Sequence, residues 1–238
     1  MSHHHIVWIN QDIQEQINHR WFQPNFWEEK DAIVGASNGR NCTYFVQQEN
    51  KQWVLRHYYR GGLIARFSKD RYVFLSEQYS RAFAEFELLK KMKQLKLPVP
   101  KPIAAHIQRL SLFYRSNIIV ERLQGYEDLS KWLERKQLSK KAWTDIGATI
   151  AQFHFHRIDH KDLNIKNILY NGDNVYLIDF DRCVQKNTHG RWQKSNMDRL
   201  LRSLQKETSL NENLHWNSEH WNDLLQAYQT KLQQLTLD

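Results

Sequence analysis

The sequence predicts an α+β fold, with strands concentrated in its first half and helices in its second. Three short apolar runs, at 32–34, 43–46 and 53–58, are separated by turn residues, as is typical of an antiparallel sheet. Over 139–153 and 219–235, apolar residues recur every three or four positions, which indicates amphipathic helices. With 238 residues, 41% of them hydrophobic and 25% charged, the chain can bury the core of one globular domain, 1–238.

The remaining predicted elements follow from the same periodicities. A helix is expected from Ser80 to Leu95, because apolar residues recur along one face before the segment LPVPKPI ends it. Short helices are expected around 13–17, 128–133 and 196–207, and strands at 112–114 and 117–120. No role is assigned to the Trp-rich residues 1–30.

The segment HKDLNIKNILYNGDNVYLIDFD, from His160 to Asp181, carries the strongest chemical pattern. The apolar run 168–170, the turn NGDN and the β-rich run 175–178 predict a hairpin that returns Asp179 to the side of Asn167. A lone HxD with a distant Asn would be a weak signal, because such residues commonly cap helices and form turns. Its combination with two strands and a second acid favours a functional site.

These residue types suit ATP-dependent phosphoryl transfer. That reaction needs a group that orients the acceptor hydroxyl and oxygen ligands that hold Mg²⁺ against the phosphates. Asp162 is the predicted catalytic base, and Asn167 and Asp179 are the predicted metal ligands. Asp181 either assists the metal or fixes the loop, and His160 is expected to organise the loop rather than carry a proton.

HKDLNIKNIL and YLIDFDR resemble the catalytic and metal-binding segments of the protein-kinase-like superfamily. The details DLN, DFDR and RHYYRGGL resemble the 3-deoxy-D-manno-octulosonic acid (Kdo) kinases, and the resemblance spans about residues 30 to 205. It implies two lobes around one cleft: an N-terminal lobe, 30–120, with an antiparallel sheet and one helix, and a reduced, mainly helical C-terminal lobe, 121–238. It also implies ATP and Mg²⁺ as cofactors.

The resemblance implies a set of nucleotide-binding residues: Gly35, Gly39, Arg40, Arg56, Glu85, Glu121 and Leu123. Arg56 stands where the superfamily has a phosphate-contacting lysine, and an arginine can offer planar, bidentate donors there. Glu85 is its predicted ion-pair partner, with Glu87 as the second choice. Without the downstream motif, a plain turn would explain the first hairpin, around Gly39, equally well.

The expected acceptor comes from the same resemblance. The Kdo kinases transfer the ATP γ-phosphate to Kdo on lipid A, expected at the 4-hydroxyl, during lipopolysaccharide inner-core assembly. Only 57 residues follow Asp181 and none resemble an APE motif, which disfavours protein substrates. The alternatives are a heptose kinase of the lipopolysaccharide core, an aminoglycoside- or choline-type phosphotransferase, and an inactive kinase-fold binding module.

Charge and composition constrain the partners. The net charge is +8, and Lys51–Arg71 contains six basic residues against Asp70 alone, which suggests either an anionic partner or a solvated face. Arg60 and Arg66 are possible acceptor-binding residues for the Kdo–lipid A glycolipid. No nucleic-acid motif is present and no obligate protein partner is expected. We expect peripheral binding to an anionic membrane, at the cytoplasmic face of the bacterial inner membrane.

The same expectation of location rests on what the sequence lacks. No apolar run is long enough for a transmembrane segment, and the first residues lack the pattern of a signal peptide. The two cysteines, Cys42 and Cys183, suit a reducing compartment, although a single bridge between them stays open. His3, His4 and His5 are set aside as either a tag remnant or a native feature.

Overall fold

The computed structural model describes residues 4–37, 43–60 and 70–237. Contacts divide the chain into two compact units. The first unit comprises Met1–Lys91 and Pro100–Gln124, and the second comprises Met92–Val99 and Gly125–Asp238. The residues before 30 therefore group with the first unit, and the segment 92–99 groups with the second. Among the described helices, none is long and apolar enough to cross a membrane.

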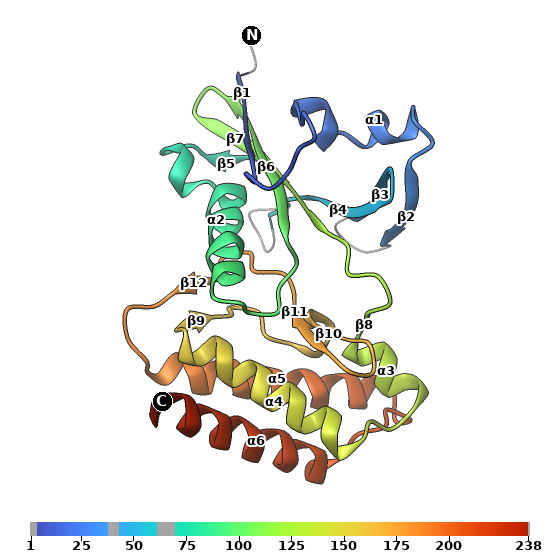
Figure 1. The fold of residues 1–238 in the computed structure, drawn as a ribbon, viewed down its shortest axis with the longest axis vertical. Coiled ribbons are helices and arrows are strands. Elements are labelled where there is room, and N and C mark those ends of the chain that lie inside the picture. Colours follow the sequence, from blue (N-terminus) through green and yellow to red (C-terminus); the bar gives the residue numbers. More distant parts are fainter. Residues whose placement is uncertain (1–3, 38–42, 61–69, 238) are drawn as a thin grey trace. The chain divides into compact units, whose positions relative to one another are not determined.

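The first unit is built on one antiparallel sheet with the strand order β1-β6-β7-β4-β3-β2, and β5 pairs with β7 (Figure 1). The strands are β1 (His4–Ile9), β2 (Ile33–Ser37), β3 (Thr43–Gln48), β4 (Lys51–His57), β5 (Tyr72–Val73), β6 (Pro102–Leu110) and β7 (Phe113–Glu121). A 3-10 helix, η3 (Glu77–Tyr79), precedes helix α2 (Arg81–Gln94). The predicted sheet and the predicted helix over 80–95 are confirmed.

The N-terminal segment covers one face of this sheet. Trp53 and Leu55 alternate along β4 toward a buried cluster with Trp21 and Trp27, and the Trp27 indole donates to the Trp21 carbonyl at 2.7 Å. The helix expected around 13–17 is wrong. The structure instead has η1 (His19–Phe22) and α1 (Pro24–Glu28). Pro24 suits the start of α1, because the first turn of a helix does not use the N–H group that proline lacks.

Strands β1 and β6 were not expected from the sequence. His4 and His5 lie in β1, which pairs along its whole length with β6. The two separate strands predicted at 112–114 and 117–120 are one continuous strand, β7, because Arg115 and Ser116 continue its pairing with β6. A polar residue in a strand with one partly exposed face does not interrupt the ladder.

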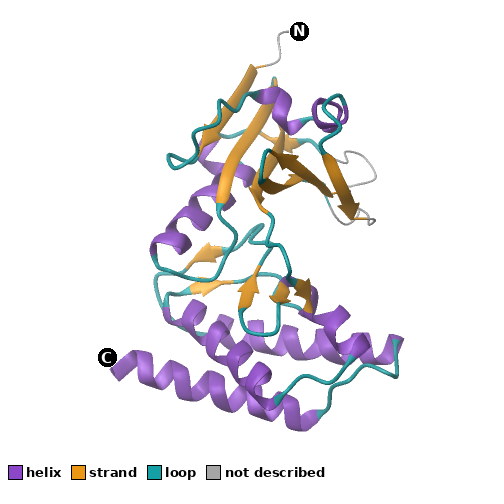
Figure 2. Ribbon diagram, turned by 45° about the vertical axis from the view of Figure 1, so that its right-hand side comes forward, coloured by secondary structure: helices purple, strands orange, loops and turns teal. Residues whose placement is uncertain are grey.

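The second unit is mainly helical, with two small sheets of order β11-β10-β8 and β12-β9 (Figure 2). Its helices are α3 (Leu129–Arg135), α4 (Lys140–Phe155), α5 (Arg191–Leu210), α6 (Ser218–Leu237) and the 3-10 helix η4 (Ile165–Asn167). Its strands are β8 (Glu127–Asp128), β9 (Ile158–Asp159), β10 (Ile168–Tyr170), β11 (Val175–Leu177) and β12 (Val184–Gln185).

Local sequence signals explain the packing of this unit. The Ser139 hydroxyl accepts from the Ala142 N–H at 3.2 Å and caps α4, as predicted. α4 and α6 lie side by side, and a Cβ at Gly147 would be 2.1 Å from the Leu224 carbonyl oxygen. Only glycine permits this approach. The helices predicted at 196–207 and 219–235 are present and longer than expected.

Candidate active site

The predicted hairpin of the second unit is present. β10 and β11 pair antiparallel, and Asn171 accepts from the N–H groups of Asp173 and Asn174 within the turn. The Ile178 N–H donates to the Asn167 carbonyl at 3.0 Å. The residue after Ile178 therefore returns beside Asn167, so that Asp179 and Asn167 lie together as the spacing predicts.

His160 ties the two parts of this element together. Its ring lies within 3.0 Å of the Ile178 carbonyl through Nε2, so that Nε2 carries the proton and donates. Nδ1 then accepts from the Asp162 N–H at 3.3 Å. Burial lowers the pKa of His160, which favours this neutral ring. The prediction that His160 organises the loop is confirmed.

A buried polar centre fixes the start of the loop. Asp159 is 1% exposed, and its carboxylate accepts from Lys161 and, at 3.0 Å, from the amide of Asn196 on α5. The Asn196 amide oxygen accepts from the His160 N–H at 2.9 Å. Burial raises the pKa of Asp159, but the hydrogen bonds from Lys161 and Asn196 outweigh it and lower the pKa overall.

The Asp162 carboxylate is open to solvent. Its side chain is 59% exposed, and the Arg199 guanidinium lies 3.7 Å from Oδ1. The backbone carbonyl of Asp162 accepts from the amides of Asn164 and Asn167, at 2.9 Å each. The main chain is thus held by two side-chain amides while the carboxylate stays exposed.

Asn167 and Asp179 have the chemistry of a Mg²⁺ site. The Asn167 amide nitrogen donates to the Asp162 carbonyl, so its oxygen is the atom that can bind a cation. Asp179 adds a carboxylate from a left-handed backbone position with φ 63°. One amide oxygen and one carboxylate are hard ligands of the type that Mg²⁺ takes, together with water and phosphate oxygens. These two residues fit the ion.

In the first unit, Arg56 on β4 and Glu85 on α2 form the predicted ion pair. The Glu85 side chain is 3% exposed and also accepts from the Tyr58 hydroxyl at 2.6 Å. Burial and the charge of Glu85 raise the pKa of Tyr58 well above its usual value. Glu87 instead pairs with Lys90 at 2.9 Å on the same helix.

Comparisons with known proteins are consistent with this arrangement. Residues 24–228 match the model of the lipopolysaccharide kinase (Kdo/WaaP) family. The chain belongs to this family. A 3-deoxy-D-manno-octulosonic acid kinase of Haemophilus influenzae (strain PittEE) is 41% identical, over 87% of this chain and 89% of that protein. One from Mannheimia succiniciproducens is 39% identical, over 94% of this chain and 96% of that protein.

A solved structure shows the same fold. WaaP in complex with acyl carrier protein aligns with a TM-score of 0.58 and 16% identity, over 95% of this chain and 92% of that chain. At this identity the likeness concerns the fold alone. The predicted protein-kinase-like α+β fold is confirmed.

Three further predicted nucleotide-binding residues lie in the described part of the first unit: Gly35, Glu121 and Leu123. Gly35 is in β2, and a Cβ there would lie 3.2 Å from the Phe45 ring. Gly39 and Arg40 fall outside the described residues. Glu121 ends β7, where its carboxylate accepts from the Lys101 N–H at 3.1 Å, and half-buried Leu123 follows it.

The two predicted acceptor-binding residues are only partly described. The Arg60 guanidinium lies 5.0 Å from the centre of the Tyr72 ring, a cation–π contact. Arg66 falls outside the described residues. Asp70, the single acid of that basic segment, binds Arg115 at 2.7 Å and lies 3.3 Å from His57. Part of the segment's positive charge thus has no acid of its own segment to neutralise it.

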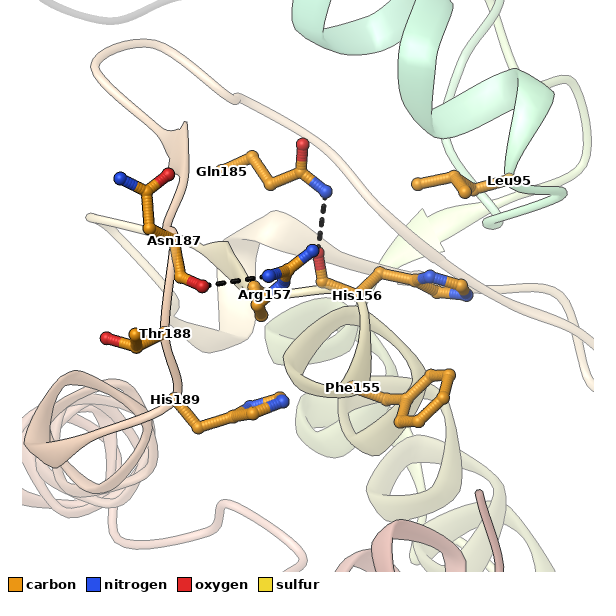
Figure 3. A pocket seen from close by; sticks show the side chains of 8 residues that line it. All are labelled: Leu95, Phe155, His156, Arg157, Gln185, Asn187, Thr188 and His189. Atoms are coloured by element: carbon orange, nitrogen blue, oxygen red, sulfur yellow. Dashed lines mark hydrogen bonds between the residues drawn. The ribbon is translucent and has the colours of Figure 1, made fainter. Parts of the chain in front are cut away.

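A cavity of about 540 Å³ in the second unit contains none of the predicted site residues (Figure 3). The Arg157 guanidinium donates to the Asn187 carbonyl at 2.8 Å, and the Gln185 amide donates to the His156 carbonyl at 3.0 Å. These bonds join the residues that follow α4 to β12 and the segment after it. With Arg157 as the one charged side chain among those lining it, the cavity offers no carboxylate for the chemistry of a kinase.

Sequence reasoning missed the residues that hold the loop. Asn196 and Ser203 on α5 bind loop backbone: Asn196 accepts from His160, and the Ser203 hydroxyl accepts from the Ile165 N–H at 3.2 Å. Buried Asp159, directly before the HxD motif, was a possible signal. Cys183 is a buried cysteine whose sulfur accepts from the Lys161 N–H at 3.3 Å. Cys42 falls outside the described residues.

Proposed function

We propose that this chain is a Kdo kinase, which transfers the γ-phosphate of ATP to the 4-hydroxyl of Kdo on lipid A during lipopolysaccharide inner-core synthesis. The similarity to proteins named 3-deoxy-D-manno-octulosonic acid kinase, over nearly the whole of both chains, carries this proposal. The geometry of the loop around Asp162 supports it, because a carboxylate open to solvent stands beside two oxygen ligands for a cation.

In the proposed reaction Asp162 accepts the proton of the sugar hydroxyl. That oxygen forms a bond to the γ-phosphorus as the bond between the γ-phosphorus and the bridging oxygen of ADP breaks. Asn167 and Asp179 hold Mg²⁺, which when bound neutralises and orients the phosphates. The loop contributes mainly by positioning Asp162, since His160 and Asn196 fix its backbone before substrate arrives.

The first unit is proposed to bind the nucleotide. Arg56 would contact the phosphates, with Glu85 fixing its orientation through a buried ion pair. The backbone around Gly35, Gly39 and Arg40 is proposed to approach the phosphates, and Glu121 and Leu123 to meet adenine. We further propose that the two units correspond to the two lobes predicted from the sequence, 30–120 and 121–238.

We propose that the enzyme acts at the cytoplasmic face of the inner membrane as a peripheral protein. A net charge of +8 favours a surface of anionic lipids. Arg60 and Arg66 would contribute to binding the acceptor. No obligate protein partner is proposed, although the solved WaaP structure contains acyl carrier protein.

The test is an assay with ATP, Mg²⁺ and a panel of acceptors: Kdo–lipid A, heptosylated core and an aminoglycoside. We expect phosphate on Kdo–lipid A, at the 4-hydroxyl when the product is mapped by NMR. Phosphate found only on the heptosylated acceptor would replace this proposal with a heptose kinase. Nucleotide binding without transfer to any acceptor would indicate an inactive kinase-fold module.

A further inference from the structure

A hollow of about 360 Å³ lies beside Asp162, wholly within the second unit. One wall is the loop from Asp162 to Lys166, and the other is the face of α5 from Arg199 to Glu207. No function is predicted from the sequence for this face of α5. The volume lies in the usual range for small-molecule sites, roughly 300–1,000 Å³, and is too small for an acyl-chain glycolipid as a whole.

The charges of this α5 groove are unbalanced. It is lined by four basic and two acidic side chains. Lys166 pairs with Glu207 at 2.8 Å, and Arg199 lies 3.7 Å from Asp162. Within the described part of the chain, no acid lies in ion-pair distance of Arg202 or Lys206. These two exposed cations are therefore in excess on the wall of the hollow.

The basic side chains that α5 contributes to the hollow share one face of the helix. Arg199, Arg202 and Lys206 follow at spacings of three and four residues, which places them in a row. Like charges four residues apart repel each other, and an anion bound between them would remove that repulsion. At 1.5 Å per residue, Arg202 lies about 4.5 Å and Lys206 about 10 Å along the helix from the level of Arg199.

The row is fastened to the catalytic loop at two points. Asn196, near the start of α5, accepts from the His160 N–H at 2.9 Å. One turn beyond Arg199, the Ser203 hydroxyl accepts from the Ile165 N–H at 3.2 Å. These bonds flank Asp162 in the sequence. The distance between the Asp162 carboxylate and the basic row is therefore set before any substrate binds, as a site that aligns a substrate requires.

We propose that this groove binds an anionic group of the acceptor, a carboxylate or a phosphate, and thereby aligns a hydroxyl of the same molecule with Asp162. Arg202 supplies planar, bidentate donors, and Lys206 supplies a second positive charge farther along the helix. The inference rests on the proposed function. It makes the enzyme selective for acidic acceptors, because a neutral sugar would leave the two cations without a counter-charge.

The experiment compares R202Q, K206Q and the double variant with the wild type in steady-state transfer to Kdo–lipid A. We expect each single change to raise the KM for the acceptor about tenfold, the effect of one charge-assisted hydrogen bond, with the KM for ATP unchanged. K194Q is the matched control. It removes a positive charge from the same helix, where Lys194 pairs with Asp198 at 2.7 Å outside the groove.

Two modified acceptors identify the anionic group. If Arg202 binds the sugar carboxylate, the wild type will show the same rise in acceptor KM with a carboxyl methyl ester of Kdo–lipid A as R202Q shows with the intact acceptor. In R202Q the ester will then cause no further rise in acceptor KM. If the group is a phosphate, a dephosphorylated lipid A will show this behaviour instead. Unchanged acceptor KM values in R202Q, K206Q and the double variant would overturn the inference.

Direct binding separates the inference from the proposed function. Calorimetric titration with free Kdo and with inorganic phosphate is performed on the wild type, R202Q and K194Q. Binding that is weakened only in R202Q, without phosphorylation of Kdo–lipid A, would reject the proposed function and keep the groove. Phosphorylation of Kdo–lipid A with equal acceptor KM in all variants would reject the groove and keep the function.

Discussion

In the first unit Arg56 donates to Glu85, whose side chain is 3% exposed, whereas in the second unit the Asp162 carboxylate is 59% exposed. The first group takes its orientation from a buried partner that contacts it directly. Beside the second, the guanidinium of Arg199 lies 3.7 Å from one carboxylate oxygen. The orientation of this carboxylate comes through the loop backbone, which His160 and Asn196 hold by hydrogen bonds.

The difference follows from the tasks proposed for the two groups. A guanidinium that meets phosphate has five donors, so it can bind a buried carboxylate and still offer donors to a ligand. A carboxylate that receives a proton must keep its oxygens open, so a direct partner would compete with the substrate. Substitution of Arg56 should therefore change nucleotide binding, and substitution of Asp162 should change turnover.

The largest effect is expected from Asp162→Asn. The amide keeps the size of the side chain but cannot take the proton, so kcat should fall by about 10²- to 10⁴-fold. Because the side chain is exposed, the melting temperature and the Kd for ATP should stay near those of the wild type. Steady-state transfer, thermal unfolding and nucleotide titration check this. Near-normal kcat in the variant would exclude Asp162 as the base.

The second effect concerns the buried support of the loop. Asn196→Ala removes one donor to Asp159 and one acceptor for His160, and leaves a buried carboxylate short of a hydrogen bond. We expect the free energy of unfolding to drop by about 2–3 kcal/mol. Urea unfolding measures it. Ser195→Ala, at an exposed neighbouring position, is the control, and equal losses in both variants would contradict the role of Asn196.

A third effect separates the units by pH. His106, buried in the first unit, receives a hydrogen bond from the Asn117 amide at 3.0 Å and meets His5 at 3.0 Å, with His19 and His57 nearby. Burial and these neighbours lower its pKa from 6.5 to about 3. Below about pH 6.5 the unfolded chain therefore binds more protons at this residue than the folded chain does, and the free energy of unfolding decreases as the pH is lowered. The loss should be about 2 kcal/mol between about pH 7 and pH 5.

The variant that tests this is His106→Gln. Between about pH 7 and pH 5 its free energy of unfolding should decrease by about 2 kcal/mol less than that of the wild type, whatever its stability at neutral pH. Part of the dependence will remain, because burial also lowers the pKa of His154, in the second unit, to about 4. His4→Gln, at an exposed position of the neighbouring strand β1, should keep the full slope. The same slope in His106→Gln would refute the assignment to His106.

The sequence was sufficient for the hairpin and for the placement of Asn167 and Asp179, because these depend on local signals. Turn residues and alternating strands return Asp179 beside Asn167 without help from distant segments. The pairing of β1 with β6 joins residues 95 to 105 positions apart, from Ile9 with Ala104 to His4 with Arg109, and the loop support from Asn196 acts across 36 residues. Periodicity carries no information on such partners. The structure of residues 1–30 could not be predicted either, because their tryptophans take their positions from packing on the sheet.

The smallest effect is expected from Arg56→Lys, which restores the residue usual in the superfamily. The charge and the pair with Glu85 can persist, and Tyr58 continues to donate to that carboxylate at 2.6 Å. Only the planar fork is lost, so the KM for ATP should rise about threefold with kcat within about twofold, less than one full hydrogen bond. Arg109→Lys, at an exposed position of β6, is the control. A fall in kcat without a change in the KM for ATP would mean that Arg56 acts on the transferring group, as Asp162 does, and would remove the distinction between the two units.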